Sequence, residues 1–151
     1  VGEQGKVYAF DVQYEAIERT KQKLQSEALS NVHLIHDGHQ NLNQYLDQED
    51  RGKISAAIFN LGYLPGSDKS IITKPTDTIS AIDQIIADLK PGGIIVCVVY
   101  HGHPGGEEEK DALFTHLKQF EQKEFNVLQY GFINQKNKPP FILAIEKKQT
   151  D

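Results

Sequence analysis

Short apolar runs alternate along this chain with longer stretches in which apolar residues recur at helical spacing. The short runs predict buried strands, and the spaced stretches predict amphipathic helices. The predicted strands cover residues 6–11, 32–36, 54–61, 94–100, 125–133 and 141–146. The predicted helices cover residues 14–28, 42–46, 76–89 and 107–120, and the third of these ends at a Lys-Pro-Gly-Gly turn over residues 90–93.

This order, with strands and helices alternating until two final strands, predicts an α/β fold with a mostly parallel sheet. Helices are expected on both faces of the sheet, and the closing strand pair predicts an antiparallel C-terminal edge strand. The strand at residues 54–61 is apolar almost throughout, which is typical of a strand covered on both faces. The length of 151 residues suits a single domain over residues 1–151.

Composition narrows the class of protein further. The net charge is −5, which counts against indiscriminate binding of nucleic acid through lysine and arginine. No apolar run approaches the roughly 18 residues that cross a bilayer. We therefore expect no membrane span and a cytoplasmic protein. Cys97 lies within an apolar run and is expected to be a buried, inert thiol. The chain contains no methionine and begins at Val1, so we expect it to be N-terminally incomplete.

The most informative motif joins the end of the third predicted strand to a loop rich in Gly, Tyr and Pro. Asn60 ends this strand, and the loop begins with Gly62, Tyr63, Leu64 and Pro65. Ligands of open α/β sheets bind at the carboxyl ends of the strands. An asparagine here can simply form a turn and a tyrosine can simply pack. The alternative is that the Asn60 amide oxygen accepts hydrogen bonds from an amine and the Tyr63 ring stacks on a base. Both are therefore candidate catalytic residues.

Acidic residues end the first two predicted strands, at Asp11 and Asp37. A carboxylate offers two acceptors to a ribose diol, although an acid at a strand end also caps a following helix. The histidines at positions 33, 36 and 39 invite a metal interpretation. They lack a completing cysteine or acidic cluster, so no metal site is predicted.

Several motifs in this order resemble one bacterial family. They are the strings Asn-Leu-Gly-Tyr-Leu-Pro-Gly at 60–66, Lys-Pro-Gly-Gly at 90–93 and Tyr-His-Gly-His-Pro-Gly-Gly at 100–106. The chain is similar over nearly its whole length to the rRNA methylases, which have a Rossmann-like class I methyltransferase fold. The resemblance implies an S-adenosylmethionine-dependent enzyme that methylates the 5-aminomethyl group of the wobble uridine in the tRNA anticodon. The family's first strand and glycine-rich turn would precede Val1.

The resemblance also implies roles for individual residues. The implied cofactor-binding residues are Asp11, Gln13, Asp37, Gly38, His39, Asn60 and Leu61. The implied substrate-binding residues are Gly62, Tyr63, Leu64, Pro65, Tyr100, His101 and His103. A homodimer would enlarge an RNA-binding face.

Other functions stay open from the sequence. The nearest is methylation of rRNA, protein or a small amine, which the negative net charge favours slightly. A non-catalytic nucleotide-binding or interaction domain belongs to a different class, and a glycine-rich turn upstream would count against it. An NAD-dependent dehydrogenase shares the ribose-binding acid but does not explain the motif that begins at Asn60.

Overall fold

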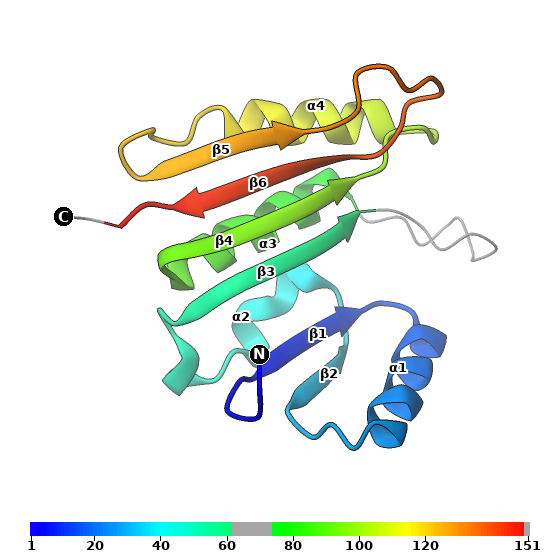
Figure 1. Ribbon diagram of the computed structural model, residues 1–151, viewed down its shortest axis with the longest axis vertical. Helices are drawn as coiled ribbons and strands as arrows, with labels where there is room; N and C mark the ends of the chain where they lie inside the picture. The colour runs from blue at the N-terminus through cyan, green and yellow to red at the C-terminus, as the bar shows by residue number, and fades with distance from the viewer. Residues whose placement is uncertain (62–73, 150–151) are drawn as a thin grey trace. The chain divides into compact units, whose positions relative to one another are not determined.

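The computed structural model describes residues 1–61 and 74–149 (Figure 1). In chain order the elements are β1 (Val7–Asp11), α1 (Tyr14–Ser26), β2 (Val32–His36), η1 (His39–Asn41), α2 (Leu42–Tyr45), η2 (Gln48–Asp50), β3 (Ile54–Leu61), α3 (Pro75–Asp88), β4 (Leu89–Val99), α4 (Gly106–Leu117), β5 (Phe125–Tyr130) and β6 (Phe141–Lys147). The chain divides into two compact units, residues 1–46 and 47–151.

The first unit is a parallel strand pair with one long helix. β1 and β2 pair in register from Val7 opposite Val32 to Asp11 opposite His36. α1 returns the chain between them and packs on β2. Parallel neighbours need such a crossover, and it brings the carboxyl ends of both strands to the same edge.

The second unit is a four-stranded sheet in the order β3-β4-β6-β5. β3 and β4 are parallel, whereas β6 runs antiparallel to both β4 and β5. The crossover through α4 places β5 two strand positions beyond β4, and the return strand β6 fills the position between them. The predicted antiparallel edge is therefore present, with β5 at the edge and the C-terminal strand inside.

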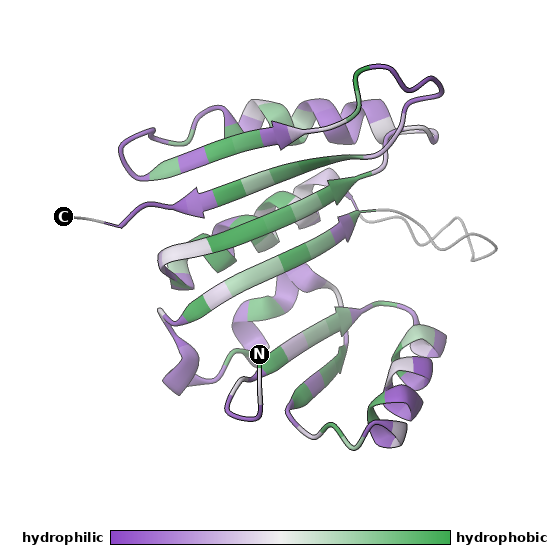
Figure 2. Cartoon of the chain, viewed as in Figure 1, coloured by the Kyte–Doolittle hydropathy of each residue, from purple (hydrophilic) through white to green (hydrophobic). Residues whose placement is uncertain are grey.

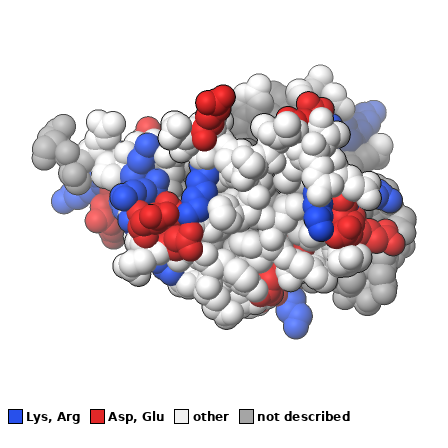
Figure 3. Space-filling model, turned by 90° about the horizontal axis from the view of Figure 1, so that it is seen from below, with Lys and Arg blue, Asp and Glu red and all other residues white. Residues whose placement is uncertain are grey.

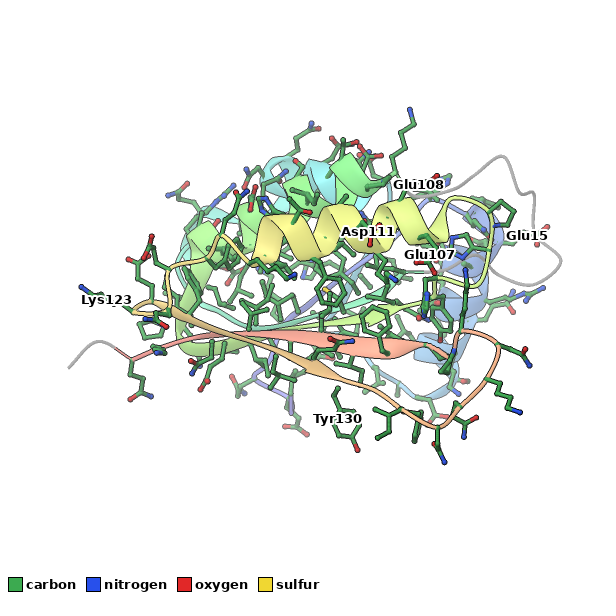
Figure 4. All side chains as sticks on the ribbon, turned by 90° about the horizontal axis from the view of Figure 1, so that it is seen from above. Glu15, Glu107, Glu108, Asp111, Lys123 and Tyr130 are labelled. Atoms are coloured by element: carbon green, nitrogen blue, oxygen red, sulfur yellow. The ribbon has the colours of Figure 1, made fainter. Side chains whose placement is uncertain are left out.

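α3 and α4 both cover the same face of this sheet (Figures 1 and 4). Alternate residues of β4 point to that face, and Ile95, Cys97 and Val99 are almost completely buried there. The helices contribute the buried side chains Ile82 and Leu113 to the same core. The strong apolar colouring of β4 and β6 in Figure 2 marks this layer.

No described helix of the second unit covers the opposite face of the four-stranded sheet. Ile58 on β3 is 79% exposed, so the prediction that this strand is covered on both faces is wrong for the second unit. The physical reason is that α3 and α4, the described α-helices of the unit, pack on the other face, which holds Phe59 and Leu61.

Several predicted boundaries also move, among them the starts of α3 and β4 and the end of β5, which stops at Tyr130 rather than at residue 133. α3 begins at Pro75, with the extended residue Lys74 as its N-cap, because proline fits the first turn of a helix. β4 begins at Leu89, five residues before the predicted start, because Leu89 already pairs with Ile54. The Lys-Pro-Gly-Gly segment thus lies inside the strand. Gly92 has a positive φ of 79 degrees there, and this left-handed backbone favours glycine.

Among the described helices, none combines the length and the apolar composition required to span a membrane.

Candidate functional site

Asp11 occupies the carboxyl end of β1, beside the end of β2. Its Oδ1 accepts a hydrogen bond from the backbone N–H of Gln13 at 2.8 Å, and Gln13 is the N-cap of α1. One carboxylate oxygen therefore holds the turn into the helix. Its other oxygen has no hydrogen bond to the described residues, so it remains available to a ligand hydroxyl.

Asp37 follows β2 and is held by three donors from the turn after it. Oδ1 accepts hydrogen bonds from the Gly38 N–H at 2.7 Å and the Asn41 amide at 2.9 Å. Oδ2 accepts one from the Tyr45 hydroxyl at 2.7 Å. These bonds, that from Tyr45 above all, hold the pKa of Asp37 below its ordinary value, and the same bond raises the pKa of Tyr45. The carboxylate is thus fixed in place before any ligand binds.

Gly38 and His39 lie in the same turn. A Cβ at Gly38 would meet only the flexible end of the Gln40 side chain, and Gly38 has an ordinary φ of −71 degrees, so the turn into η1 does not require glycine. His39 starts η1 and is partly buried. The edge of β1 and β2 therefore brings together five of the predicted cofactor residues: Asp11, Gln13, Asp37, Gly38 and His39.

The neighbouring histidines of β2 have separate contacts. The His33 ring stacks on Tyr8 with centroids 5.4 Å apart. Nε2 of His36 lies 3.0 Å from the Val12 carbonyl oxygen and therefore donates to it.

The carboxyl edge of β3 and β4 holds a second group of predicted residues. Asn60 lies opposite Val98, and its exposed side chain is on the face of the sheet that α3 and α4 do not cover. Leu61 is buried on the helix side, and its carbonyl oxygen accepts a hydrogen bond from the Tyr100 N–H at 3.3 Å. The structure therefore brings Asn60, Leu61 and Tyr100 to one edge.

The predicted residues Gly62, Tyr63, Leu64 and Pro65 lie outside the described residues.

His101 lies in the loop after β4 and is tied to two other segments. Its Nδ1 is 2.9 Å from Oε1 of Glu107, and its Nε2 is 3.2 Å from the Pro139 carbonyl oxygen. Its ring also meets the edge of Phe141. Both hydrogen-bond partners are acceptors, so the ring makes both bonds at once only when both nitrogens carry a proton. His101 thus joins the β4 loop to the turn between β5 and β6, and His103 lies in the same loop.

Glu107, in the first turn of α4, is the centre of this cluster (Figure 4). Besides His101, it pairs with Lys110 at 2.6 Å and with Lys138 at 3.1 Å. These partners, Lys110 first, lower the pKa of Glu107 to about 2. Lys138 lies in the turn before β6 and has a positive φ of 51 degrees, so the ion pair holds a residue with left-handed backbone.

Glu109 is a buried acid that the sequence analysis did not single out. It is 6% exposed, its Oε1 has no hydrogen-bond partner among the described residues, and burial raises its pKa to about 6. The spacing of Glu109, Leu113 and Leu117, four residues apart, was the signal that identifies it as facing the core. Thr78, in the first turn of the neighbouring helix α3, is likewise buried, and its hydroxyl has no partner within the described part of the chain.

Charge on the surface is mixed. On the face drawn in Figure 3, Lys and Arg side chains lie beside Asp and Glu side chains in small clusters. This face therefore carries no large patch of one charge that would steer a charged ligand toward it. The net charge of the chain is −5.

Each edge, in its own unit, offers a distinct chemistry. The free oxygen of Asp11 and the fixed Asp37 carboxylate suit the hydroxyls and amino group of a nucleoside. The exposed Asn60 amide suits an amine, whose hydrogens its oxygen can accept. These donors and acceptors fit an adenosine-containing cofactor and a nitrogen nucleophile.

Comparison with known sequences agrees with this chemistry. Residues 7–146 match the family described as "Putative rRNA methylase". A curated relative from Arabidopsis thaliana, described as a chloroplastic tRNA (mnm(5)s(2)U34)-methyltransferase, is 44% identical over 117 residues. The match covers 75% of this chain and 42% of that relative.

Two solved structures similar to this chain are likewise described as a methylase and a methyltransferase. An rRNA methylase from Clostridium thermocellum has a TM-score of 0.90 and 46% identity, with 97% of this chain and 77% of that chain covered. A methyltransferase from Streptococcus mutans, solved with SAH, has a TM-score of 0.85 and 46% identity, with 94% and 76% covered. More distant methyltransferases, such as NodS from Bradyrhizobium japonicum at 13% identity and a TM-score of 0.62, share the fold.

Proposed function

Because this chain belongs to the rRNA methylase family of S-adenosylmethionine-dependent methyltransferases, we propose that it methylates the 5-aminomethyl group of the wobble uridine in tRNA. The observation that carries the proposal is the exposed Asn60 at the carboxyl end of β3, within a sequence that matches the family over residues 7–146. The printed activity of the plant relative supports the choice of substrate.

In this proposal the cofactor is bound by groups that the fold already orients. Asp11 accepts hydrogen bonds from the ribose hydroxyls, and Asp37, with Gly38 and His39 beside it, binds the adenine end. Gln13, Asn60 and Leu61 contribute further contacts, Asn60 through its backbone. When bound, the cofactor supplies an electrophilic methyl group on sulfur.

Asn60 has the main task on the substrate side. A primary alkylamine is mostly protonated in water. Its removal from solvent lowers its pKa, and this favours the neutral amine. The Asn60 side-chain oxygen then accepts an amine hydrogen and aims the nitrogen lone pair. Correct orientation of the reacting groups can lower the activation barrier of methyl transfer by about 7–11 kcal/mol in favourable cases.

Tyr63 stacks on the uridine base in this proposal, with Gly62, Leu64 and Pro65 forming the substrate loop. Tyr100 and His103 contact the nucleotide from the loop after β4. His101 contributes to the same pocket and is held in place by Glu107. The reaction takes place in the cytoplasm, with the tRNA anticodon region as the partner.

The test is methyl transfer by the purified chain. Isotopically labelled S-adenosylmethionine is incubated with bulk tRNA that contains 5-aminomethyluridine, and the digested nucleosides are separated by mass. Label in the methylaminomethyl form of the wobble uridine is the expected result. If label enters only rRNA, protein or a small amine, the proposed tRNA substrate is wrong. If calorimetry detects no cofactor binding, the chain is a non-catalytic domain.

A further inference from the structure

One row of paired residues crosses the four-stranded sheet at the level of Asn60. Asn60 on β3 pairs with Val98 on β4, and Val98 pairs with Ile142 on β6. Ile142 in turn pairs with Tyr130 on β5. Residues that pair across neighbouring strands point to the same face of a sheet. Tyr130 therefore shares the face of Asn60, and Figure 4 shows its side chain pointing away from α4.

The row also fixes the distance between its two ends. Asn60 and Tyr130 are three strand positions apart, and with neighbouring strands about 4.8 Å apart their separation is about 14 Å. Both side chains are exposed, Tyr130 to 68%. A base whose amine lies at Asn60 cannot also reach the Tyr130 ring. Tyr130 is thus placed to meet a different nucleotide of the same strand.

The segment that contains Tyr130 has a composition that suits single-stranded RNA. Residues 125–145 contain no Asp or Glu, although the chain holds 21 of them. Tyr130 and Phe132, which is 66% exposed, offer aromatic faces, and every base can stack on such a ring. Lys136 and Lys138 follow in the next turn, and lysines bind backbone phosphates. All the formal charge of this segment is therefore complementary to that of RNA.

The turn between β5 and β6 is continuous with the substrate side of the candidate site. Nε2 of His101 lies 3.2 Å from the Pro139 carbonyl oxygen. A Cβ at Gly102 would lie 3.7 Å from the Lys138 carbonyl oxygen, so the loop after β4 and this turn are in contact. The Lys138 side chain is 55% exposed although it pairs with Glu107, which leaves room for a phosphate beside its ammonium group.

We propose that Tyr130 stacks on a nucleotide near the methylated one in the substrate RNA, and that Lys136 and Lys138 bind phosphates beside it. This inference rests on the proposed function and extends it along the sheet edge. The RNA strand runs from Asn60 past the loop after β4 to the turn between β5 and β6. A free nucleoside or a small amine would occupy only the Asn60 end, so the Tyr130 end selects an RNA strand over these smaller amines.

Fluorescence anisotropy with a labelled anticodon stem–loop RNA, carrying 5-aminomethyluridine at the wobble position, tests the proposal on the purified chain. Tyr130→Ala should raise Kd about 5- to 150-fold, whereas Tyr130→Phe, which keeps the ring, should stay within about twofold of wild type. Lys136→Ala should reduce the slope of log Kd against log salt by about 0.7. Lys123→Ala removes an exposed lysine before β5 (Figure 4) and should change neither quantity.

Abasic sites in the RNA identify the nucleotide that Tyr130 contacts. Each loop base is removed in turn, and each RNA is measured with wild type and with Tyr130→Ala as a double-mutant cycle. The two changes should be non-additive at a position near the wobble uridine and additive at the wobble uridine itself. Non-additivity at the wobble uridine alone, or additivity at every position, would contradict the proposal.

Methyl transfer to the same RNA separates this proposal from the proposed function. Tyr130→Ala should raise KM for the RNA and leave kcat at saturating RNA unchanged, because Tyr130 does not touch the reacting amine. If wild type binds the RNA through Tyr130 but transfers no methyl group, the proposed function is wrong and the RNA surface stands. If wild type methylates the RNA and Tyr130→Ala changes neither Kd nor KM, the function stands and the surface is wrong.

Two further results would overturn the RNA surface. One is a wild-type chain that does not bind the stem–loop at all. The other is a change of mass in Tyr130→Ala, measured by light scattering after size exclusion, since Tyr130 would then contact protein rather than RNA.

Discussion

The two sheet edges that carry the candidate residues are organised in different ways. At the end of β2, every hydrogen bond to Asp37 comes from a residue within eight positions along the chain. At the end of β4, His101 bonds to Pro139, which is 38 positions away. The first edge is therefore built by its own turn, whereas the second depends on a distant segment of the chain.

This difference suggests a division of labour. A locally built edge is ready to bind as soon as its strand pair forms, which suits recognition of the cofactor. An edge that includes Asn60, Tyr100 and His101 is complete only when β5 and β6 are in place, which suits the reacting side. Changes at the first edge should then alter affinity, and changes at the second should alter turnover.

The largest expected effect is at Asn60. Asn60→Ala removes the acceptor that orients the amine, so kcat should fall roughly 100-fold or more. Cofactor affinity, measured by calorimetry, should stay nearly unchanged. Asn134→Ala, another exposed asparagine after a strand, is the control and should keep full turnover. If Asn60→Ala left turnover unchanged, Asn60 would have no part in the mechanism. The assignment of turnover to the second edge would then be wrong.

Asp11→Ala tests the other edge. Loss of hydrogen bonds to a charged acceptor costs about 1.5–3 kcal/mol, so cofactor binding should weaken roughly 10- to 150-fold. Glu15→Ala, which removes an exposed acid in the next helix, should leave affinity unchanged. If Asp11→Ala lowered turnover at saturating cofactor while affinity held, the two edges would not be separate in function.

Glu107 and Glu109, two residues apart on α4, should give opposite pH dependences of stability. The pKa of Glu109 is raised from 4.5 to about 6, so its ionisation destabilises the fold as pH rises through this range. Glu109→Gln should therefore raise the free energy of unfolding at pH 7 by about 2 kcal/mol, with no gain at pH 4.

The pKa of Glu107 is lowered to about 2, so it stabilises the fold above its ordinary pKa and loses this effect as pH falls through the lowered value. Glu107→Gln should be less stable than wild type at pH 7 and equal to it near pH 2. Denaturant unfolding at several pH values measures both variants. Parallel pH profiles for the two would contradict the structure.

The smallest effect is expected from Tyr45→Phe. The Tyr45 hydroxyl is the chief cause of the lowered Asp37 pKa, so its loss should raise that pKa toward the ordinary value. Carbon-detected NMR titration of the Asp37 carboxyl measures the change. Cofactor affinity should change little, because the Gly38 and Asn41 donors remain. An unmoved pKa would show that the turn is not held by this bond.

Much of the fold follows from local pattern. The bounds of β2 and β3 are those predicted, because a short apolar run between polar turns leaves few alternatives. The interior position of β6 was not predictable in this way, since a strand's neighbours are chosen by tertiary packing. The same holds for Ile58, whose exposure depends on which face the helices cover.

The residues of the candidate site also fall into those that local sequence predicts and those that tertiary packing brings together. The acids at the strand ends and Asn60 were visible as residue types at the ends of apolar runs. The cluster of His101, Glu107 and Lys138 was not, because its members are brought together by a chain reversal between β5 and β6. Glu109 was visible in principle from its spacing with Leu113, but it lies in a run of three glutamates at residues 107–109, which is also typical of a helix N-terminus that acids stabilise from the solvent side.

The buried Cys97 can report on transient opening of the four-stranded sheet. It is the one cysteine of the chain, is fully buried in β4, and burial raises its pKa to about 12. A thiol reagent can therefore modify it only while the central strand is transiently exposed. The rate of modification under native conditions then gives the opening free energy of the four-stranded sheet, with no engineered label.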